Sequence, residues 1–159
     1  MPESLDIALN RLKIKASQID GVDVLVLPEN VFTSDETLFD TPESVELAKH
    51  LKKQGVACKT SFDLQVETDV LERRGLDIWL GILWILREAV APEAMEYIRM
   101  YIRQILPRIK SSEPPIVHLK IGIKRENATA ELDFKGPPDS LDSVLQALKC
   151  PTELPKLGS

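Results

Sequence analysis

This chain has few cysteines, no excess of basic residues and no long apolar run. Only Cys58 and Cys150 occur among its 159 residues, far apart and outside any Cys-x-x-Cys pattern. This predicts reduced structural thiols, and neither a disulfide framework nor a zinc site. The net charge of -5 is too acidic for a dedicated nucleic-acid binder, and 28% charged residues of balanced sign are untypical of a disordered chain. The first ten residues lack the pattern of a secretory signal, so we predict a cytoplasmic protein that binds no nucleic acid.

The chain also lacks the short motifs that mark catalysis. It contains no Gly-x-Ser-x-Gly elbow, no Gly-x-x-x-x-Gly-Lys phosphate loop, no Gly-x-Gly-x-x-Gly and no His-Glu-x-x-His. Its two histidines, His50 and His118, have no motif partner, which favours surface or hydrogen-bonded roles for both. We therefore predict no catalytic, cofactor-binding or metal-binding residues, and a protein that is not an enzyme.

What the chain does contain is an α+β pattern, which begins with a βαβ-like part over residues 1–67. Residues 22–27, VDVLVL, have the composition of a buried strand. Before them, the apolar residues Leu5, Ala8 and Leu12 favour a helix, although the alternation in RLKIKAS also fits a strand. Thr41 as N-cap, Pro42 in the first helical position and Gly55 as the stop predict a helix. The β-like stretch VACKTSF follows at once, which completes the strand, helix and strand order.

The central part, residues 68–110, is predicted to be a pair of helices that meet near Pro92. In the second helix, apolar residues recur at the spacing that places them on one face. In the first, every residue from Ile78 to Leu86 is apolar or glycine, so all sides of that helix would be apolar.

This apolar stretch lies within LDIWLGILWILREAVAP, residues 76–92, and holds both tryptophans. Asp77 and Arg87 enclose far fewer than the roughly 20 apolar residues of a membrane span, which argues against a membrane partner. A buried core helix and a helix that contacts another chain both fit, and tryptophan is enriched at interface hot spots. The interaction residues predicted from this pair of helices are Ile78, Trp79, Ile82, Trp84, Ile85, Met95, Ile98, Tyr101 and Ile102.

The third part, residues 111–150, is predicted to be a β-hairpin with a covering helix. Apolar and polar residues alternate in IVHLKIGIK and ATAELDF, with a turn at residues 125–127. Lys120 and Lys124 could then face Glu131 and Asp133 across the strands. Asp139 or Ser140 is expected to cap the following helix. We predict a single α+β domain over residues 1–150, and a loose tail over 151–159.

Two alternatives to protein association follow from other features. Residues 21–48 contain seven acidic and no basic residues, whereas residues 99–125 contain seven basic residues and only Glu113 as an acid. The acidic stretch would suit an immunity or inhibitor protein that meets a basic toxin. The stretch GVDVLVLPENVF resembles the strand of nitrilase-family amidases that delivers a catalytic glutamate, here Glu29. A small enzyme or ligand-binding domain with a pocket near Glu29 and Cys58 is therefore the other alternative.

The overall layout bears a further resemblance. The order of a strand, the helix TPESVELAKHLKKQGV, the stretch VLERRGLDIWLGILW, a second helix, VHLKIGIK and AELDFKGPPDSLDSVLQAL is similar to that of small uncharacterised bacterial α+β proteins. These proteins are akin to the effector-associated accessory components of conflict and defence systems. The resemblance covers roughly residues 22–149 and implies a non-enzymatic accessory module that acts by self-association or effector binding. It carries over no functional residues.

Overall fold

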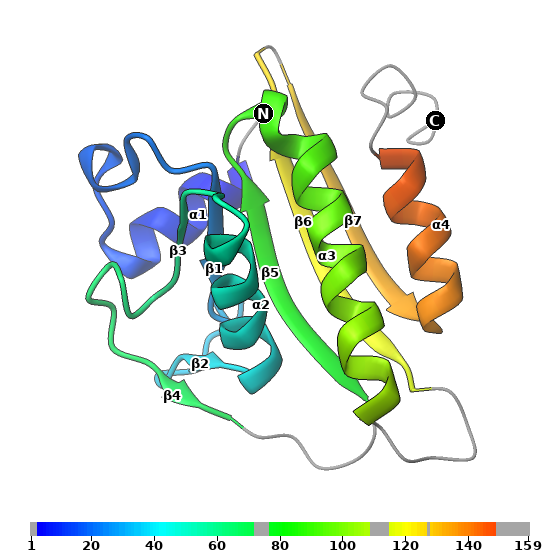
Figure 1. Cartoon of the computed structure of the whole chain (residues 1–159). Helices are drawn as coiled ribbons and strands as arrows, with labels where there is room; N and C mark the ends of the chain where they lie inside the picture. Colours follow the sequence, from blue (N-terminus) through cyan, green and yellow to red (C-terminus); the bar gives the residue numbers. More distant parts are fainter. Residues whose placement is uncertain (1–2, 72–76, 109–114, 127, 149–159) are drawn as a thin grey trace.

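Five strands form one mixed sheet in the order β3-β1-β5-β6-β7. The computed structural model describes residues 3–71, 77–108, 115–126 and 128–148 (Figure 1). β1 and β3 are parallel, β1 and β5 antiparallel, β5 and β6 parallel, and β6 and β7 antiparallel. The strands are β1 (Val24–Leu27), β3 (Cys58–Lys59), β5 (Ile78–Ile85), β6 (Val117–Lys124) and β7 (Thr129–Gly136).

The helices cover the two faces of this sheet unequally. α2 (Pro42–Lys53), α3 (Ala91–Ile105) and α4 (Pro138–Leu148) lie side by side in front of the strands in Figure 1, and α1 (Glu3–Leu12) lies behind them. Short 3-10 turns and a small second sheet complete the described structure. They are η1 (Ala16–Ile19), η2 (Glu88–Val90), η3 (Leu106–Arg108), and the parallel pair β2 (Phe39–Asp40) and β4 (Asp69–Val70). The fold class is α+β, as predicted.

The N-terminal part is the predicted βαβ unit, preceded by the predicted helix. Thr41 caps α2: its side chain accepts a hydrogen bond from the backbone N–H of Ser44 at 3.2 Å. Gly55 follows the helix with a φ of +91°, in the left-handed region that glycine adopts without strain. β3 returns parallel to β1, with Cys58 beside Val24. The Thr41 hydroxyl also donates to the Trp79 carbonyl at 2.5 Å, which ties the start of α2 to β5.

The first of the two predicted central helices is wrong: the tryptophan stretch is the strand β5. β5 lies in the middle of the sheet between β1 and β6. Because it is covered on both faces, it needs apolar residues at every position, and period-2 alternation is lost. Leu83 and Ile85 belong to the core under α2 and α3, whereas Ile82 and Trp84 belong to the core under α1.

The second central helix and the C-terminal part are confirmed. α3 begins beside Pro92 and buries the predicted apolar face, and β6 and β7 form the hairpin. The turn at residues 125–127 is closed by a bond from the Arg125 N–H to the Ala128 carbonyl, although Asn127 lies outside the described residues. α4 begins at Pro138, one residue before the first predicted cap, so that cap prediction is wrong. Cys150 and the predicted loose tail, residues 151–159, lie outside the described residues.

α4 is fixed to α3 by a buried arginine. Arg99 makes two bonds to the Asp142 carboxylate, from Nε at 2.8 Å and from Nη2 at 3.1 Å. Its Nη1 donates to Glu96 at 2.8 Å. Leu141 and Leu145 of α4 are fully buried in the core under the helical layer. α4 therefore covers the apolar side of the hairpin, as predicted.

Candidate functional site

On the face opposite α2, α3 and α4, no described helix covers the half of the sheet that β6 and β7 form. The buried cluster under α1 draws its strand residues from β1 and β5 and, within the described chain, contains none from β6 or β7. We call the β6 and β7 side chains that point to this side the open face. They are His118, Lys120, Gly122, Lys124, Glu131, Asp133 and Lys135.

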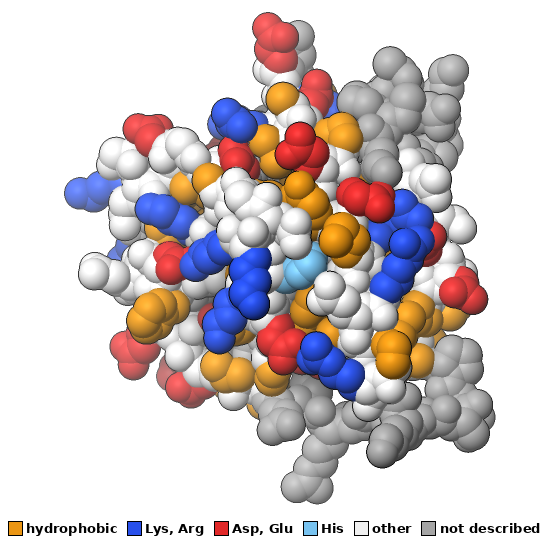
Figure 2. Space-filling model, viewed as in Figure 1, with side chains coloured by type: hydrophobic (Ala, Val, Ile, Leu, Met, Phe, Trp, Pro, Cys, Tyr) orange, Lys and Arg blue, Asp and Glu red, His pale blue; other side chains and the backbone are white. Residues whose placement is uncertain are grey.

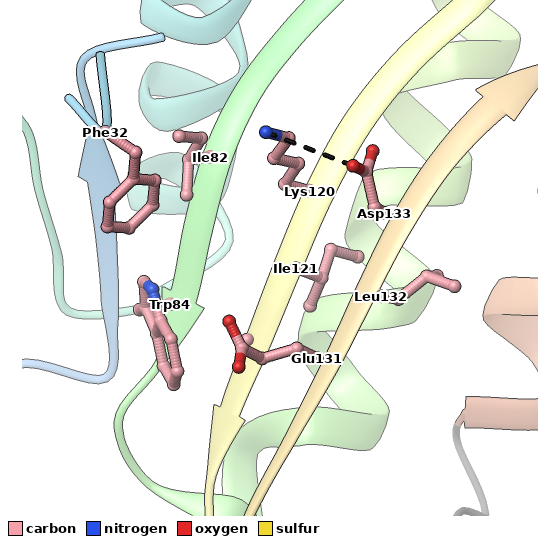
Figure 3. Close-up of a pocket in the computed structure, with 9 residues that line it drawn as sticks. Phe32, Ile82, Trp84, Lys120, Ile121, Glu131, Leu132 and Asp133 are labelled. Atoms are coloured by element: carbon pink, nitrogen blue, oxygen red, sulfur yellow. Dashed lines mark ion pairs between the residues drawn. The ribbon is translucent and has the colours of Figure 1, made fainter. Parts of the chain in front are cut away.

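A groove of about 360 Å³ lies where the open face meets the half that α1 covers. Phe32, Ile82 and Trp84 stand on one side of it, and Lys120 and Asp133 on the other (Figure 3). Trp84 is 1% exposed, so its ring forms part of the floor. Gly122 lies directly under that ring, because a Cβ built on Gly122 would come within 2.6 Å of three atoms of the indole. Because glycine has no side chain, the indole ring of Trp84 can lie against the backbone of β6 and form part of the floor of the groove.

The charged side chains beside the groove are arranged across the hairpin. Lys120 faces Asp133 in the register of β6 and β7, and its Nζ lies 3.9 Å from the carboxylate. This confirms the predicted pairing for Lys120, whereas the pairing predicted for Lys124 is wrong, because Lys124 faces Thr129 and Glu131 faces Gly122. Both side chains stay well exposed, and Glu131 next to them is exposed as well. The groove thus joins an apolar side to a charged side.

The aromatic wall of the groove is held in place by α1. Phe32 lies in the loop after β1 and is 41% exposed. Arg11 of α1 donates to the carbonyls of Asn30 at 3.1 Å and Val31 at 2.6 Å, and also to those of Thr33 and Asp35. One guanidinium therefore satisfies four carbonyls on both sides of Phe32.

The Asn30 side chain fixes the same loop from within. Its amide donates to the Thr37 carbonyl at 2.8 Å, and its carbonyl oxygen accepts from the Phe39 N–H at 2.8 Å. Asp35 accepts a further bond from Asn30, and this hydrogen bond is the first cause of a lowered pKa of the Asp35 carboxyl. The loop that carries Phe32 is therefore tied down at both ends.

A stacked pair of rings lies at the far end of the open face. The Trp79 and His118 rings are nearly parallel, at 3°, with centroids 3.6 Å apart. The His118 Nε2 lies 3.0 Å from the Asp77 carboxylate. His118 is therefore hydrogen-bonded and stacked, in line with the role predicted for it.

Most of the predicted interaction residues are buried. Trp79 is partly exposed, and the rest are at most 5% exposed: Ile78, Ile82, Trp84, Ile85, Met95, Ile98, Tyr101 and Ile102. The buried residues of β5 divide between the two cores because β5 is sandwiched between α1 and the helical layer, and the residues of α3 belong to the core under that layer. Their contact with a partner stays a prediction, and in this conformation only Trp79 and the groove side of Ile82 and Trp84 offer a surface for it.

The proposed pair of Glu29 and Cys58 is not brought together. Cys58 lies beside Val24 at the start of β1, whereas Glu29 follows the end of that strand. The length of β1 separates these positions. Cys58 is buried, and burial raises the pKa of its thiol to about 12, far from a nucleophilic thiolate. The alternative of a ligand site near these two residues stays a prediction, with Cys58 beside the start of β1 and Glu29 after its end.

The acidic and basic stretches meet each other and take part in internal contacts. Arg108 lies 3.6 Å from Glu46, and Tyr101 donates to the same carboxylate at 3.0 Å. Asp23 pairs with Arg87 at 2.6 Å, and Asp40 is buried. Figure 2 shows acidic and basic side chains interspersed on the face that carries the helices.

Within the described ranges, no group of three His, Cys, Asp or Glu side chains is placed to hold a metal ion. No helix in the described part of the chain is long and apolar enough to cross a membrane. Neither protein-family models, curated proteins nor solved structures match the chain.

The groove depends on a contact between two strands that local sequence pattern does not show. The alternation in β6 and β7 predicted a polar side of the hairpin correctly, and Lys120 with its acidic partner lies there. The groove also needs Trp84 beside Gly122, which requires β5 to be a strand next to β6. The eight-residue length and the Ile and Trp content of residues 78–85 were signals that favour a strand.

Proposed function

We propose that this chain is a non-enzymatic protein-binding module, and that the open face with its groove is the contact surface. The observation that carries the proposal is the uneven cover of the sheet. Three helices pack on one face, whereas the described residues leave β6 and β7 bare on the other. A partner protein can reach this surface without any unfolding. The layout resemblance to accessory components of bacterial conflict and defence systems supports a role of the same kind.

The composition of the surface suits a protein partner. Stable interfaces combine a few apolar or aromatic anchors with a polar rim. Phe32 and Ile82 supply apolar surface, and Lys120, Asp133 and Glu131 form a charged rim. The Lys120–Asp133 pair has side chains that are 51% and 74% exposed. An ion pair this exposed contributes roughly 0–1 kcal/mol to stability. Lys120 and Asp133 can therefore separate and pair with charged groups of a partner protein at a small cost in free energy.

Preorganisation of the loop supports the same role. Binding loses affinity when a flexible loop must first be ordered. The four carbonyl contacts of Arg11 and the bonds of Asn30 already hold the loop around Phe32. Phe32 is therefore presented to a partner in a fixed position, although it is partly exposed.

The test compares two exposed phenylalanines. Phe32 lines the groove, whereas Phe62 is 88% exposed after β3, at the opposite edge of the sheet. The wild type, Phe32→Ser, Lys120→Glu and Phe62→Ser serve as bait in extracts of the cells that encode the chain, and captured proteins are quantified by mass spectrometry. We expect one defined protein to be captured by the wild type and Phe62→Ser, and lost with Phe32→Ser and Lys120→Glu. Equal capture by all four folded baits would contradict the proposal.

A further inference from the structure

We infer that β7 pairs antiparallel with β7 of a second copy of the chain, so that two five-stranded sheets join into one. The inference rests on the proposed function, because it assigns a second copy of the chain as the partner of β7, the strand at the edge of the open face. In the joined sheet, the open faces of the two copies would lie on the same side. The two grooves would then form one continuous surface.

The first support is the edge itself. β7 is the last strand of the sheet and extends over eight residues, Thr129–Gly136, with no proline inside it. Among the described residues, no strand pairs with its outer side. An edge of this length presents a row of backbone donors and acceptors that is a template for another strand. The opposite edge, β3, has only two residues and offers no comparable template.

The second support is the order of charges along β7. Glu131, Asp133 and Lys135 are all exposed on the open face. An edge with charges of a single sign would repel its own copy, whereas this edge carries both signs. When two β7 strands run antiparallel around a two-fold axis at Asp133, Glu131 of each copy lies opposite Lys135 of the other. The two Asp133 carboxylates meet at the axis, where each already has Lys120 as a partner.

The third support comes from the other side of the same strand. Leu132 and Phe134 are only partly buried against the core, and Val144 of α4 is partly buried beside them. In the register centred on Asp133, Leu132 of each copy lies opposite Phe134 of the other. Aromatic and aliphatic residues opposite each other across strands are favourable pairs. The pairing would therefore cover apolar surface that one copy leaves half exposed.

Neighbouring registers are less favourable. A centre on Leu132 places Glu131 opposite Asp133 twice, and like charges directly opposite destabilise a strand pair. A centre on Phe134 places Asp133 opposite Lys135, but the ladder then reaches Pro137 sooner and is shorter. The register centred on Asp133 has one like-charge pair, at the axis, against two opposite-charge pairs, and it keeps the longer ladder.

Charge reversal tests this register directly. Sedimentation velocity over a range of concentrations should show a reversible dimer for the wild type. Glu131→Lys and Lys135→Glu each turn two attractive pairs into two repulsive ones, so each should raise the dimer dissociation constant about tenfold or more. An equimolar mixture of the two variants should recover the dimer, because each cross-strand pair of the mixed dimer again joins one lysine to one glutamate. Lys124→Glu is the control, since it makes the same charge change on the open face but one strand away from the edge.

The outcomes separate this inference from the proposed function. A wild type that stays monomeric throughout, or a dimer that neither reversal weakens, overturns the β7 pairing. Failure of the mixture to recover the dimer overturns the register. If the dimer behaves as expected but Phe32→Ser still captures every protein that the wild type captures, the pairing stands and the groove is not the contact surface. If capture depends on Phe32 but the chain is monomeric, only the β7 pairing is lost.

Discussion

Replacing Gly122 by alanine tests whether the floor of the groove is packed as described. A Cβ at this position would lie 2.5 to 2.6 Å from Cε2, Cδ2 and Cε3 of Trp84, closer than atoms in contact approach. The indole is 1% exposed and packed under α1, so it has little room to move. Overpacking of this kind costs about 1–3 kcal/mol. Gly→Ala offsets about 0.4–1 kcal/mol of this through the unfolded chain.

We therefore expect Gly122→Ala to lower the free energy of unfolding by about 1–2 kcal/mol, a difference of roughly 3–6 °C in melting temperature for a chain of this size. Urea titration and thermal melts followed by circular dichroism measure both quantities. Gly136→Ala is the matched control, because its nearest contact is the outer end of the Phe134 ring, 3.1 Å away on an edge strand. It should cost less than Gly122→Ala.

A double-mutant cycle isolates the cause. In a Trp84→Leu background the ring is absent, so adding Gly122→Ala should cost much less than it does in the wild type. A Gly122→Ala protein as stable as the wild type would refute the close approach of the indole. An equal cost in both backgrounds would show that the strain comes from the backbone and not from Trp84.

Three further predictions concern buried or paired side chains. The bonds from Arg99 lower the pKa of Asp142, so the stability it supplies is present above the unfolded carboxyl pKa and falls away in acid. Because the Asp142 side chain is 36% exposed and solvent screens the pair, Asp142→Asn should cost only about 0.5–1 kcal/mol at pH 7 and much less near pH 3, by urea titration. An equal cost at both pH values would count against the ion pair. Burial raises the pKa of the Asp40 carboxyl. The stability that the protonated carboxyl contributes is therefore fully present below the pKa that Asp40 has in the unfolded chain, and it is lost as the pH rises through the pKa of the folded state. The free energy of unfolding of Asp40→Asn, relative to that of the wild type, should therefore increase from pH 3 to pH 7. A decrease over this range would contradict a raised pKa of Asp40. In a Cys150→Ser background, the buried Cys58 should resist a thiol reagent at pH 8 until urea unfolds the chain, and rapid labelling of the native protein would show that it is accessible.

The sequence predicted those elements whose signals are local. Thr41, Pro42 and Gly55 define the ends of α2 through capping, a fixed φ and a left-handed stop, and each acts within a few residues. The hairpin of β6 and β7 was predictable because one of its faces is polar, so its alternation survives in the sequence.

The strand β5 was not predicted because its environment erases the signal. Both of its faces are buried, so the choice between a strand and a helix depended on neighbours that lie far away in the sequence. The cover by α1, and with it the bare half of the sheet, depends in turn on the order of strands. The candidate site is therefore a product of tertiary arrangement, and only its charged hairpin side was visible from local pattern.

The antiparallel ladder between β1 and β5 also affects how the chain is made. It joins the N-terminal strands to the rest of the sheet through residues about sixty positions apart, a costly loop to close. During synthesis, which proceeds from the N-terminus, β1 leaves the ribosome well before β5 exists. The strand β5, by contrast, finds β6 through the single intervening helix α3 soon after both have emerged. We therefore expect the C-terminal half to assemble as a template on which the N-terminal half, though older, completes its fold last.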